Sequence, residues 1–177
     1  MKALRVNEFG GPQVLKVEDA AEPKAGAGQV VVRVKAVGVN PVDTYIRSGA
    51  YAKVIQPPYT PHSDAAGVVE GVGEGVTHVR AGDRVFITGT TSPGFSGAAA
   101  ELVLCRASQV HALVPSLSFA QGAAIYIPYG TAWRSLFQRA RGQAGETLLV
   151  HGASGGVGIA SLQIARRAGF IVIGTAG

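Results

Sequence analysis

The stretch His151-Gly152-Ala153-Ser154-Gly155-Gly156-Val157-Gly158 decides the fold of the second part of this 177-residue chain. Read from Ala153, it has the pattern Ala-x-Gly-x-x-Gly, a variant of the dinucleotide-binding fingerprint with alanine in the first glycine position. Ala153 permits a tight turn out of a strand, and Gly155 lets a diphosphate approach the backbone. Gly158 lets the following helix pack closely on the sheet. The alternative interpretation is a glycine-rich corner that binds no ligand.

The residues on either side of this turn predict one βαβ unit. Thr147–His151 is expected to be a buried strand, and His151 at its end is interpreted as a packed core histidine. A second buried strand is expected over 170–173, after a helix that ends near Gly169. The helix should pack through one face, made of residues at helical spacing: Val157, Ala160, Ser161, Ile164 and Ala168. Parallel pairing of the two strands gives a right-handed crossover.

The first part of the chain has the pattern of short strands separated by glycine and proline turns, which is typical of a small β-barrel or sandwich. Strands are predicted over 30–37, 65–73, 84–88, 101–104 and 110–114. Between the first two strands, a short helix should begin at Pro41 with Asn40 as its N-cap, and Gly49 should end it. Helices are also predicted over 118–126 and 128–140, and a loop over 92–100.

The composition limits the classes of protein to consider. With 47% apolar and 15% charged residues, the chain is too hydrophobic for intrinsic disorder. No run of about 18 apolar residues indicates a membrane span, and the first residues lack the core of a signal peptide. The single cysteine, Cys105, excludes an internal disulfide and a cysteine-rich zinc site, and we expect it to be a packed residue in a cytoplasmic protein.

The net charge of the chain and its last residues indicate which kind of ligand to expect. The formal net charge is +5, from 16 basic and 11 acidic residues, but no dense basic run indicates a nucleic-acid surface. Sites that prefer NAD place an acidic residue about 20 residues after the glycine turn. That position falls on Thr175-Ala176-Gly177, which has no carboxylate, and this favours NADPH over NADH.

A further motif allows a resemblance to be stated. The stretch Gly38-Val39-Asn40-Pro41-Val42-Asp43-Thr44-Tyr45-Ile46-Arg47-Ser48-Gly49 resembles the signature helix of zeta-crystallin-type NADPH:quinone oxidoreductases, in the medium-chain dehydrogenase/reductase superfamily. The stretches 9–12, 82–85, 121–124 and 150–158 resemble that family too. The resemblance implies a mixed fold: a GroES-like β-barrel catalytic domain over 1–120, followed over 121–177 by the first βαβ unit of an incomplete Rossmann α/β domain.

The resemblance also implies an activity and site residues. The expected activity is zinc-independent transfer of reducing equivalents from NADPH to a quinone, in an enzyme that forms a homo-oligomer when full length. Tyr45 matches the family tyrosine that contacts the cofactor, and Tyr45 and Asn40 would position the reacting groups. The match to the diphosphate-binding turn falls on Ser154, Gly155, Gly156 and Val157, and Gly177 matches a glycine near the adenosine. Zinc-dependent relatives place Cys at position 40 and His near Ser63.

Alternatives and departures accompany these expectations. The same cofactor would also serve an enone or acryloyl reductase, and zeta-crystallin relatives include RNA-binding and lens structural proteins. Asn40 has a second interpretation as a helix N-cap, and Asp43 as a first-turn acid favoured by the helix dipole. His62 stands where the family usually has glycine, so a positive φ there would strain the backbone. The chain supplies two of about six Rossmann strands and lacks the family's return segment, as in a fragment or a short product.

Overall fold

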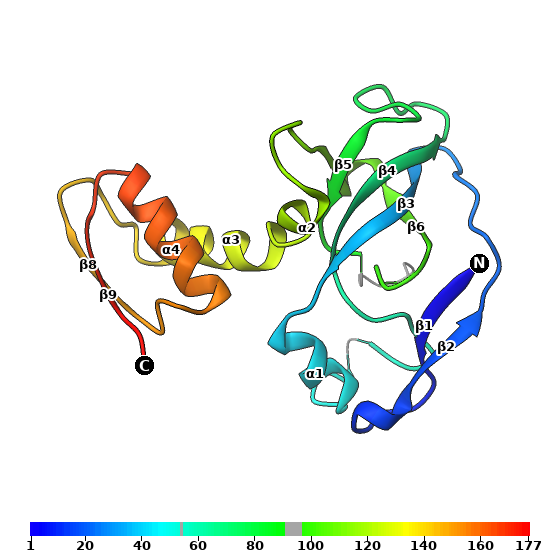
Figure 1. The fold of residues 1–177 in the computed structure, drawn as a ribbon, viewed down its shortest axis with the longest axis horizontal. Helices are drawn as coiled ribbons and strands as arrows, with labels where there is room; N and C mark the ends of the chain where they lie inside the picture. The colour runs from blue at the N-terminus through cyan, green and yellow to red at the C-terminus, as the bar shows by residue number, and fades with distance from the viewer. Residues whose placement is uncertain (54, 91–96) are drawn as a thin grey trace. The chain divides into compact units, whose positions relative to one another are not determined.

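The chain folds into two compact units in a computed structural model that describes residues 1–53, 55–90 and 97–177. The first unit is Met1–Ala124 and the second is Ile125–Gly177 (Figure 1). Within the described ranges, no helix is both long and apolar enough to cross a membrane.

A five-stranded antiparallel sheet forms the body of the first unit. Its order is β6-β3-β4-β5-β7, and the strands are β3 (Gln29–Gly38), β4 (Asp64–Val72), β5 (Arg84–Ile87), β6 (Leu102–Arg106) and β7 (Val110–Ala112). All five strands predicted from the sequence are therefore present, although β6 begins and ends later than expected and β7 is shorter. This sheet is the strand-rich first part that the sequence pattern predicts.

One apolar cluster fills the curve of this sheet. It receives side chains from every strand, among them Val30, Ala65, Val85, Val103 and Val110, none of them more than 2% exposed. Branched valines suit this role because they pack well on a pleated surface. Cys105 lies in the same cluster, where burial raises the pKa of its thiol to about 12. It is thus a packed residue, as the sequence predicts.

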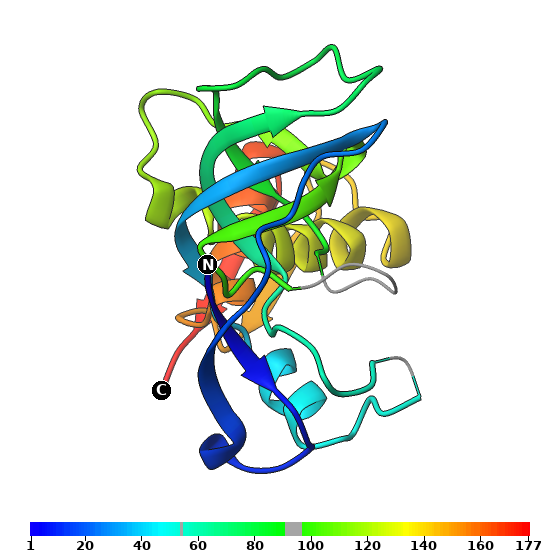
Figure 2. The ribbon, with the colours of Figure 1, turned by 90° about the vertical axis from the view of Figure 1, so that its right-hand side faces the viewer.

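A hairpin that the sequence analysis did not locate completes the first unit. It consists of β1 (Lys2–Val6) and β2 (Leu15–Asp19), joined through the short 3₁₀ turn η1 (Pro12–Val14). Figure 2 shows this hairpin and helix α1 (Pro41–Arg47) at the same end of the unit. They share a small second core, made of Val6, Val14, Ile46 and Tyr59. This core fixes α1, which carries Tyr45 and is preceded by Asn40, two of the predicted site residues.

The helices after the sheet differ from the sequence predictions. After the 3₁₀ turn η2 (Ala107–Gln109) and β7, α2 spans only Phe119–Gly122 instead of 118–126. Ser118 caps it by accepting a hydrogen bond from the N–H of Gln121 at 3.2 Å. The expected helix over 128–140 begins earlier, as α3 (Tyr126–Trp133), and continues as a π-helical segment, η3 (Arg134–Arg139). Periodicity alone does not distinguish these two helix types over so few residues.

The second unit contains the predicted βαβ element. Strands β8 (Thr147–His151) and β9 (Ile171–Thr175) pair in parallel, and α4 (Gly156–Arg167) connects them. The predicted strand, turn, helix and strand are therefore confirmed, although β9 begins one residue later and ends two residues later than expected. This element is the start of the Rossmann-type part of the fold.

The expectation that both strands are buried is wrong. Leu149 is 52% exposed and Ile171 59%, because α4 covers one face of the two-stranded sheet and no described residue covers the other. His151 is also exposed, and its Nδ1 lies 2.9 Å from the hydroxyl of Thr175. Val157, expected on the packed face of α4, is the second residue of the helix and is 41% exposed.

The loop predicted over 92–100 lies partly outside the described residues, which omit 91–96. Its remaining part joins the sheet region by backbone hydrogen bonds. The N–H of Gly97 donates to the carbonyl of Thr60, and the N–H of Ala98 donates to the carbonyl of His62. These bonds hold the segment that precedes β4.

We predict that alanine at Gly67 destabilises the first unit and that alanine at Gly71 does not. Both glycines lie in β4, but a Cβ at Gly67 would sit 2.1 Å from the carbonyl oxygen of Arg33, whereas a Cβ at Gly71 meets nothing within 4 Å. Overpacking of this kind should lower the free energy of unfolding by about 3 kcal/mol, and Gly71→Ala should change it by less than about 1 kcal/mol. Urea denaturation measures both, and equal values would contradict the prediction.

Candidate functional site

Helix α1 is fixed at its start by its own residues. Asn40 has an extended backbone and precedes Pro41, whose ring suits the first helical position. The carboxylate of Asp43 reaches back and accepts a hydrogen bond from the N–H of Asn40 at 2.7 Å. The helix ends at Arg47, and Gly49 follows with a φ of +92°, packed against Phe9. Asn40 and Gly49 thus lie at the predicted start and end of this helix, but the side chain of Asn40 makes no capping hydrogen bond.

A buried polar cluster lies against the start of α1, and we call Asn40, Asp43, His62 and Asp64 the α1 polar cluster. The side-chain amide of Asn40 donates to Asp64 Oδ2 at 3.0 Å. His62 Nδ1 lies 2.9 Å from Asp43 Oδ2, without the alignment of a good hydrogen bond. Asp43 is only 5% exposed, and its second oxygen, Oδ1, has no hydrogen-bond partner among the described residues. The cluster therefore ties α1 to the segment that enters β4.

His62 adopts the left-handed backbone conformation that the sequence analysis raised as a source of strain. Its φ is +71°, which costs a residue with a Cβ about 1–2 kcal/mol. Its carbonyl oxygen accepts hydrogen bonds from the N–H of Ala98 at 2.8 Å and from the hydroxyl of Thr90 at 3.1 Å. These bonds and the contact with Asp43 hold the residue in place.

Tyr45 is placed differently from Asn40, although both belong to the α1 region. Asn40 is 8% exposed and its amide is engaged with Asp64, whereas Tyr45 is 54% exposed. The backbone carbonyl of Tyr45 accepts from the N–H of Ala50 and from the hydroxyl of Ser48. The structure therefore brings Asn40 into the buried cluster and leaves the ring of Tyr45 at the surface of the unit.

The roles of Asp64 in this cluster and of Tyr59 beside it were not identified from the sequence. Asp64 anchors Asn40, but the two lie 24 positions apart, so no local pattern indicates the pairing. Tyr59 lies in the small core beneath α1. Burial raises the pKa of its phenol, Arg47 lowers it, and the negative charge of Asp43 raises it further.

The glycine turn of the second unit exposes four residues in succession, Ser154, Gly155, Gly156 and Val157. The turn itself is tightly packed underneath. Ala153 is buried and donates its N–H to the carbonyl of Thr175 at 2.9 Å. A Cβ at Gly158 would sit 2.3 Å from the carbonyl oxygen of Gly152, so only glycine allows this close packing of α4. At Gly155 the nearest atom would be 3.4 Å away, so its glycine leaves open space above the backbone.

The start of α4 presents free hydrogen-bond donors. In the described part of the chain, no acceptor is found for the N–H groups of Gly156 and Val157. The first turn of α4 carries no acidic residue, and its last turn carries Arg166 and Arg167. The positive end of the helix dipole and these free N–H groups make the turn suited to an anion. Gly177 lies exposed two residues after the end of β9.

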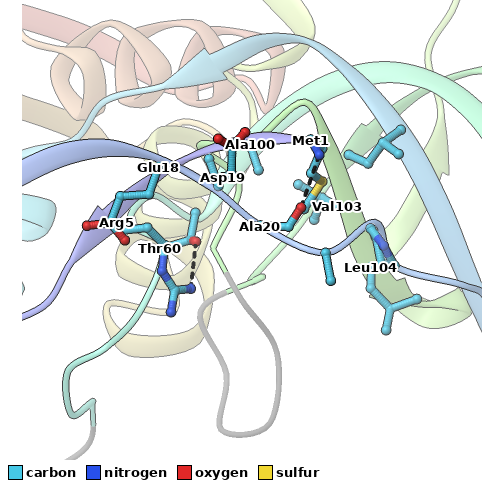
Figure 3. Close-up of a pocket in the computed structure, with 13 residues that line it drawn as sticks. Met1, Arg5, Glu18, Asp19, Ala20, Thr60, Ala100, Val103 and Leu104 are labelled. Carbon is cyan, nitrogen blue, oxygen red and sulfur yellow. Dashed lines mark hydrogen bonds between the residues drawn. The ribbon is translucent and has the colours of Figure 1, made fainter.

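Neither a metal-binding cluster nor the cavity beside the hairpin coincides with the predicted site residues in the described part of the chain. Among the described residues, no group of three or more His, Cys, Asp or Glu side chains could hold a metal ion. A cavity of about 510 Å³ lies between the hairpin and β6, where Arg5 donates to the hydroxyl of Thr60 at 3.4 Å (Figure 3). None of the site residues predicted from the sequence lines this cavity.

We predict that His62→Ala destabilises the chain more than His62→Gly. Both variants lose the contact with Asp43, but alanine keeps the strain of a positive φ and glycine does not. The free energy of unfolding should therefore be lower for alanine by about 1 kcal/mol. Denaturant unfolding of the two variants isolates this difference, and equal stability would show that the left-handed conformation is not retained.

Comparison with known proteins shows the family to which this chain belongs. A family model described as the alcohol dehydrogenase GroES-like domain matches residues 26–116. The rat protein named quinone oxidoreductase is 53% identical over 178 aligned residues, which cover 100% of this chain and 53% of that protein. The chain thus spans about half the length of the curated relatives that it matches.

Solved structures agree with this result. The crystal structure of an alcohol dehydrogenase superfamily protein from Novosphingobium aromaticivorans has a TM-score of 0.93 and 35% identity, covering 100% of this chain and 53% of that one. The Escherichia coli quinone oxidoreductase, crystallised with NADPH, has a TM-score of 0.85 and 34% identity with the same coverage. The chain therefore belongs to the alcohol dehydrogenase GroES-like family of medium-chain dehydrogenases/reductases, with quinone oxidoreductases among its relatives.

Proposed function

We propose that this chain belongs to an NADPH-dependent, zinc-independent quinone reductase. The observation that carries the proposal is the exposed glycine turn, whose free N–H groups at the start of α4 suit a diphosphate. It is supported by the similarity over the whole chain to proteins named quinone oxidoreductase, one of which was crystallised with NADPH.

The residues of the turn fit the diphosphate of a dinucleotide. A side chain at Gly155 would fill the space above the backbone that a ligand needs, since the space there is otherwise open. We assign Ser154, Gly155, Gly156 and Val157 to the diphosphate, and Gly177 to the adenosine end. No carboxylate lies in the last seven residues to repel a 2′-phosphate, which is the reason to prefer NADPH over NADH.

Tyr45 and Asn40 are assigned to the reaction on the catalytic unit. The exposed ring of Tyr45 offers a flat apolar surface and a hydroxyl, so it can contact the cofactor and hydrogen-bond a quinone oxygen. Asn40 does not face the substrate directly in this proposal, because its side-chain amide donates to Asp64 and its backbone N–H donates to Asp43. Its contribution is to hold α1, and hence Tyr45, in one orientation.

NADPH supplies the reducing equivalents when it is bound, and the protein supplies orientation and exclusion of water. The chain has Asn40 and Ser63 where zinc-dependent relatives are expected to have Cys and His, and neither is a usual zinc ligand. The buried Cys105 offers no nucleophile, since its thiol stays protonated at neutral pH. We therefore assign no metal and no covalent intermediate to the reaction.

Two wider properties follow from the same proposal. We propose a cytoplasmic location, which suits a chain whose one cysteine is a free thiol. We also propose that the complete protein is a homo-oligomer.

We predict that Gly155→Asp weakens NADPH binding by about tenfold or more, because it adds negative charge and bulk where the diphosphate should lie. The matched control is Ala144→Asp, which adds the same charge at an exposed loop position of the second unit. Titration of the ¹⁵N-labelled chain with NADPH should shift the amide signals of Gly156 and Val157 in the control and in the wild type. If those signals do not move at all, the assignment of the turn fails.

The substrate class is tested by the oxidation of NADPH at 340 nm with either 1,4-naphthoquinone or 2-cyclohexen-1-one as the acceptor. We expect little or no turnover from the 177-residue chain, because its second unit supplies two strands of a dinucleotide-binding sheet, and we expect any measurable turnover to be faster with the quinone. Faster oxidation with the enone would favour the alternative of an enone reductase. Turnover of this chain comparable to that of a full-length relative would contradict the expectation of little or no activity.

A further inference from the structure

The second unit carries a groove that the proposed function does not use. It lies between the α3–η3 segment and the C-terminal half of α4, and has a volume of about 520 Å³. Volumes of about 300–1,000 Å³ are usual for small-molecule sites. Its main lining residues are Tyr129, Trp133, Phe137, Gln163, Ile164 and Arg167. The glycine turn is at the opposite, N-terminal end of α4.

One wall of the groove is aromatic and open to solvent. Trp133 is 53% exposed, although it is the largest apolar side chain of the unit. Its ring centroid lies 4.5 Å from that of Phe137, which in turn contacts Phe170 edge-on at 6.2 Å. Phe170 thus supports Phe137 from behind and keeps the wall in place. An exposed tryptophan held by packed neighbours is typical of a binding surface.

The backbone beside this wall is unusual. Trp133 is the last residue of α3, and Phe137 belongs to the π-helical segment η3. π-Helical turns are rare, and they occur frequently at functional sites. Here the change of helix type falls between the two rings that line the groove, which is an observation independent of the volume and the exposure.

The rim of the groove is positively charged and lacks a counter-charge. Among the described residues, neither Arg166 nor Arg167 has a carboxylate within ion-pair distance. Residues 125–177 include five arginines, no lysine, no aspartate and a single glutamate, Glu146. The hydroxyl of Tyr129 donates to Oε1 of Gln163, and the side-chain NH₂ of Gln163 is a neutral donor beside the arginines. The charge left for a ligand is therefore that of the arginines.

We propose that this groove binds a planar aromatic carboxylate. The ring system lies against Trp133 and Phe137, and the carboxylate pairs with Arg167. Aromatic contacts contribute through stacking or edge-to-face packing, and guanidinium groups bind carboxylates through two parallel hydrogen bonds. A neutral ring lacks the ion pair, and an aliphatic acid lacks the aromatic contact, so both should bind more weakly.

The single tryptophan of the chain makes the test direct, since a ¹⁵N-labelled sample has one indole N–H signal, that of Trp133. The probes are 2-naphthoate and its neutral analogue 2-naphthalenemethanol. We expect a saturable shift of the indole signal with 2-naphthoate and roughly fivefold weaker binding of the alcohol. Equal affinities for the two probes, or no saturable shift with 2-naphthoate, would overturn the proposal. A shift of the indole signal with a single-stranded oligonucleotide, and not with 2-naphthoate, would also overturn the proposal.

Two variants distinguish a specific ion pair from a general effect of charge. Arg167→Gln should weaken 2-naphthoate binding roughly fivefold. Arg139→Gln removes the same charge from the same unit at an exposed position that does not line the groove, and should leave the affinity unchanged. An equal loss of 2-naphthoate affinity in both variants would contradict a specific ion pair with Arg167, because it would show that only the net charge of the unit matters. Neither variant touches the glycine turn, so the result is separate from that of the NADPH titration.

Discussion

No atom larger than hydrogen fits between Gly158 and the carbonyl oxygen of Gly152, and this close approach sets the position of α4 on its sheet. The helix begins at Gly156 directly above the turn, so its first N–H groups point to solvent instead of to a capping side chain. A bulkier residue at position 158 would lift the helix and move those donors. The position of the donors at Gly156 and Val157 thus depends on a packing constraint at Gly158, next to them in the sequence.

The first unit depends on a different constraint, the burial of the Asp43 carboxyl group in the short helix α1. An ionised carboxylate out of water is costly unless other groups contact it. Asp43 has the N–H of Asn40 and the imidazole of His62 close to one oxygen, while its other oxygen has no hydrogen-bond partner among the described residues. The left-handed backbone of His62 is part of this arrangement, because it directs the imidazole to Asp43 and is held by Ala98 and Thr90.

The features that the sequence predicted correctly depend on residues close to one another in the chain. The strand, turn and helix around Ala153 follow from small residues at fixed spacing, and the N-cap of α1 follows from Asn40 before Pro41. The pairing of Asn40 with Asp64 and the β1–β2 hairpin depend on contacts between distant residues, which carry no local pattern. The exposure of Leu149 was missed because an apolar run indicates a strand but not whether anything covers it.

Helix α4 links the two proposed binding features of the second unit through its charge distribution. The N-terminal end of a helix attracts anions, and cations are stabilised at its C-terminal end. α4 has no acid in its first turn and two arginines in its last, so both ends follow the dipole. The N–H groups at its start are free for a diphosphate, and the arginines at its end are free of carboxylate partners within the described chain. The proposed diphosphate would thus meet backbone donors at the start of α4, and the proposed carboxylate would meet side-chain cations at its end.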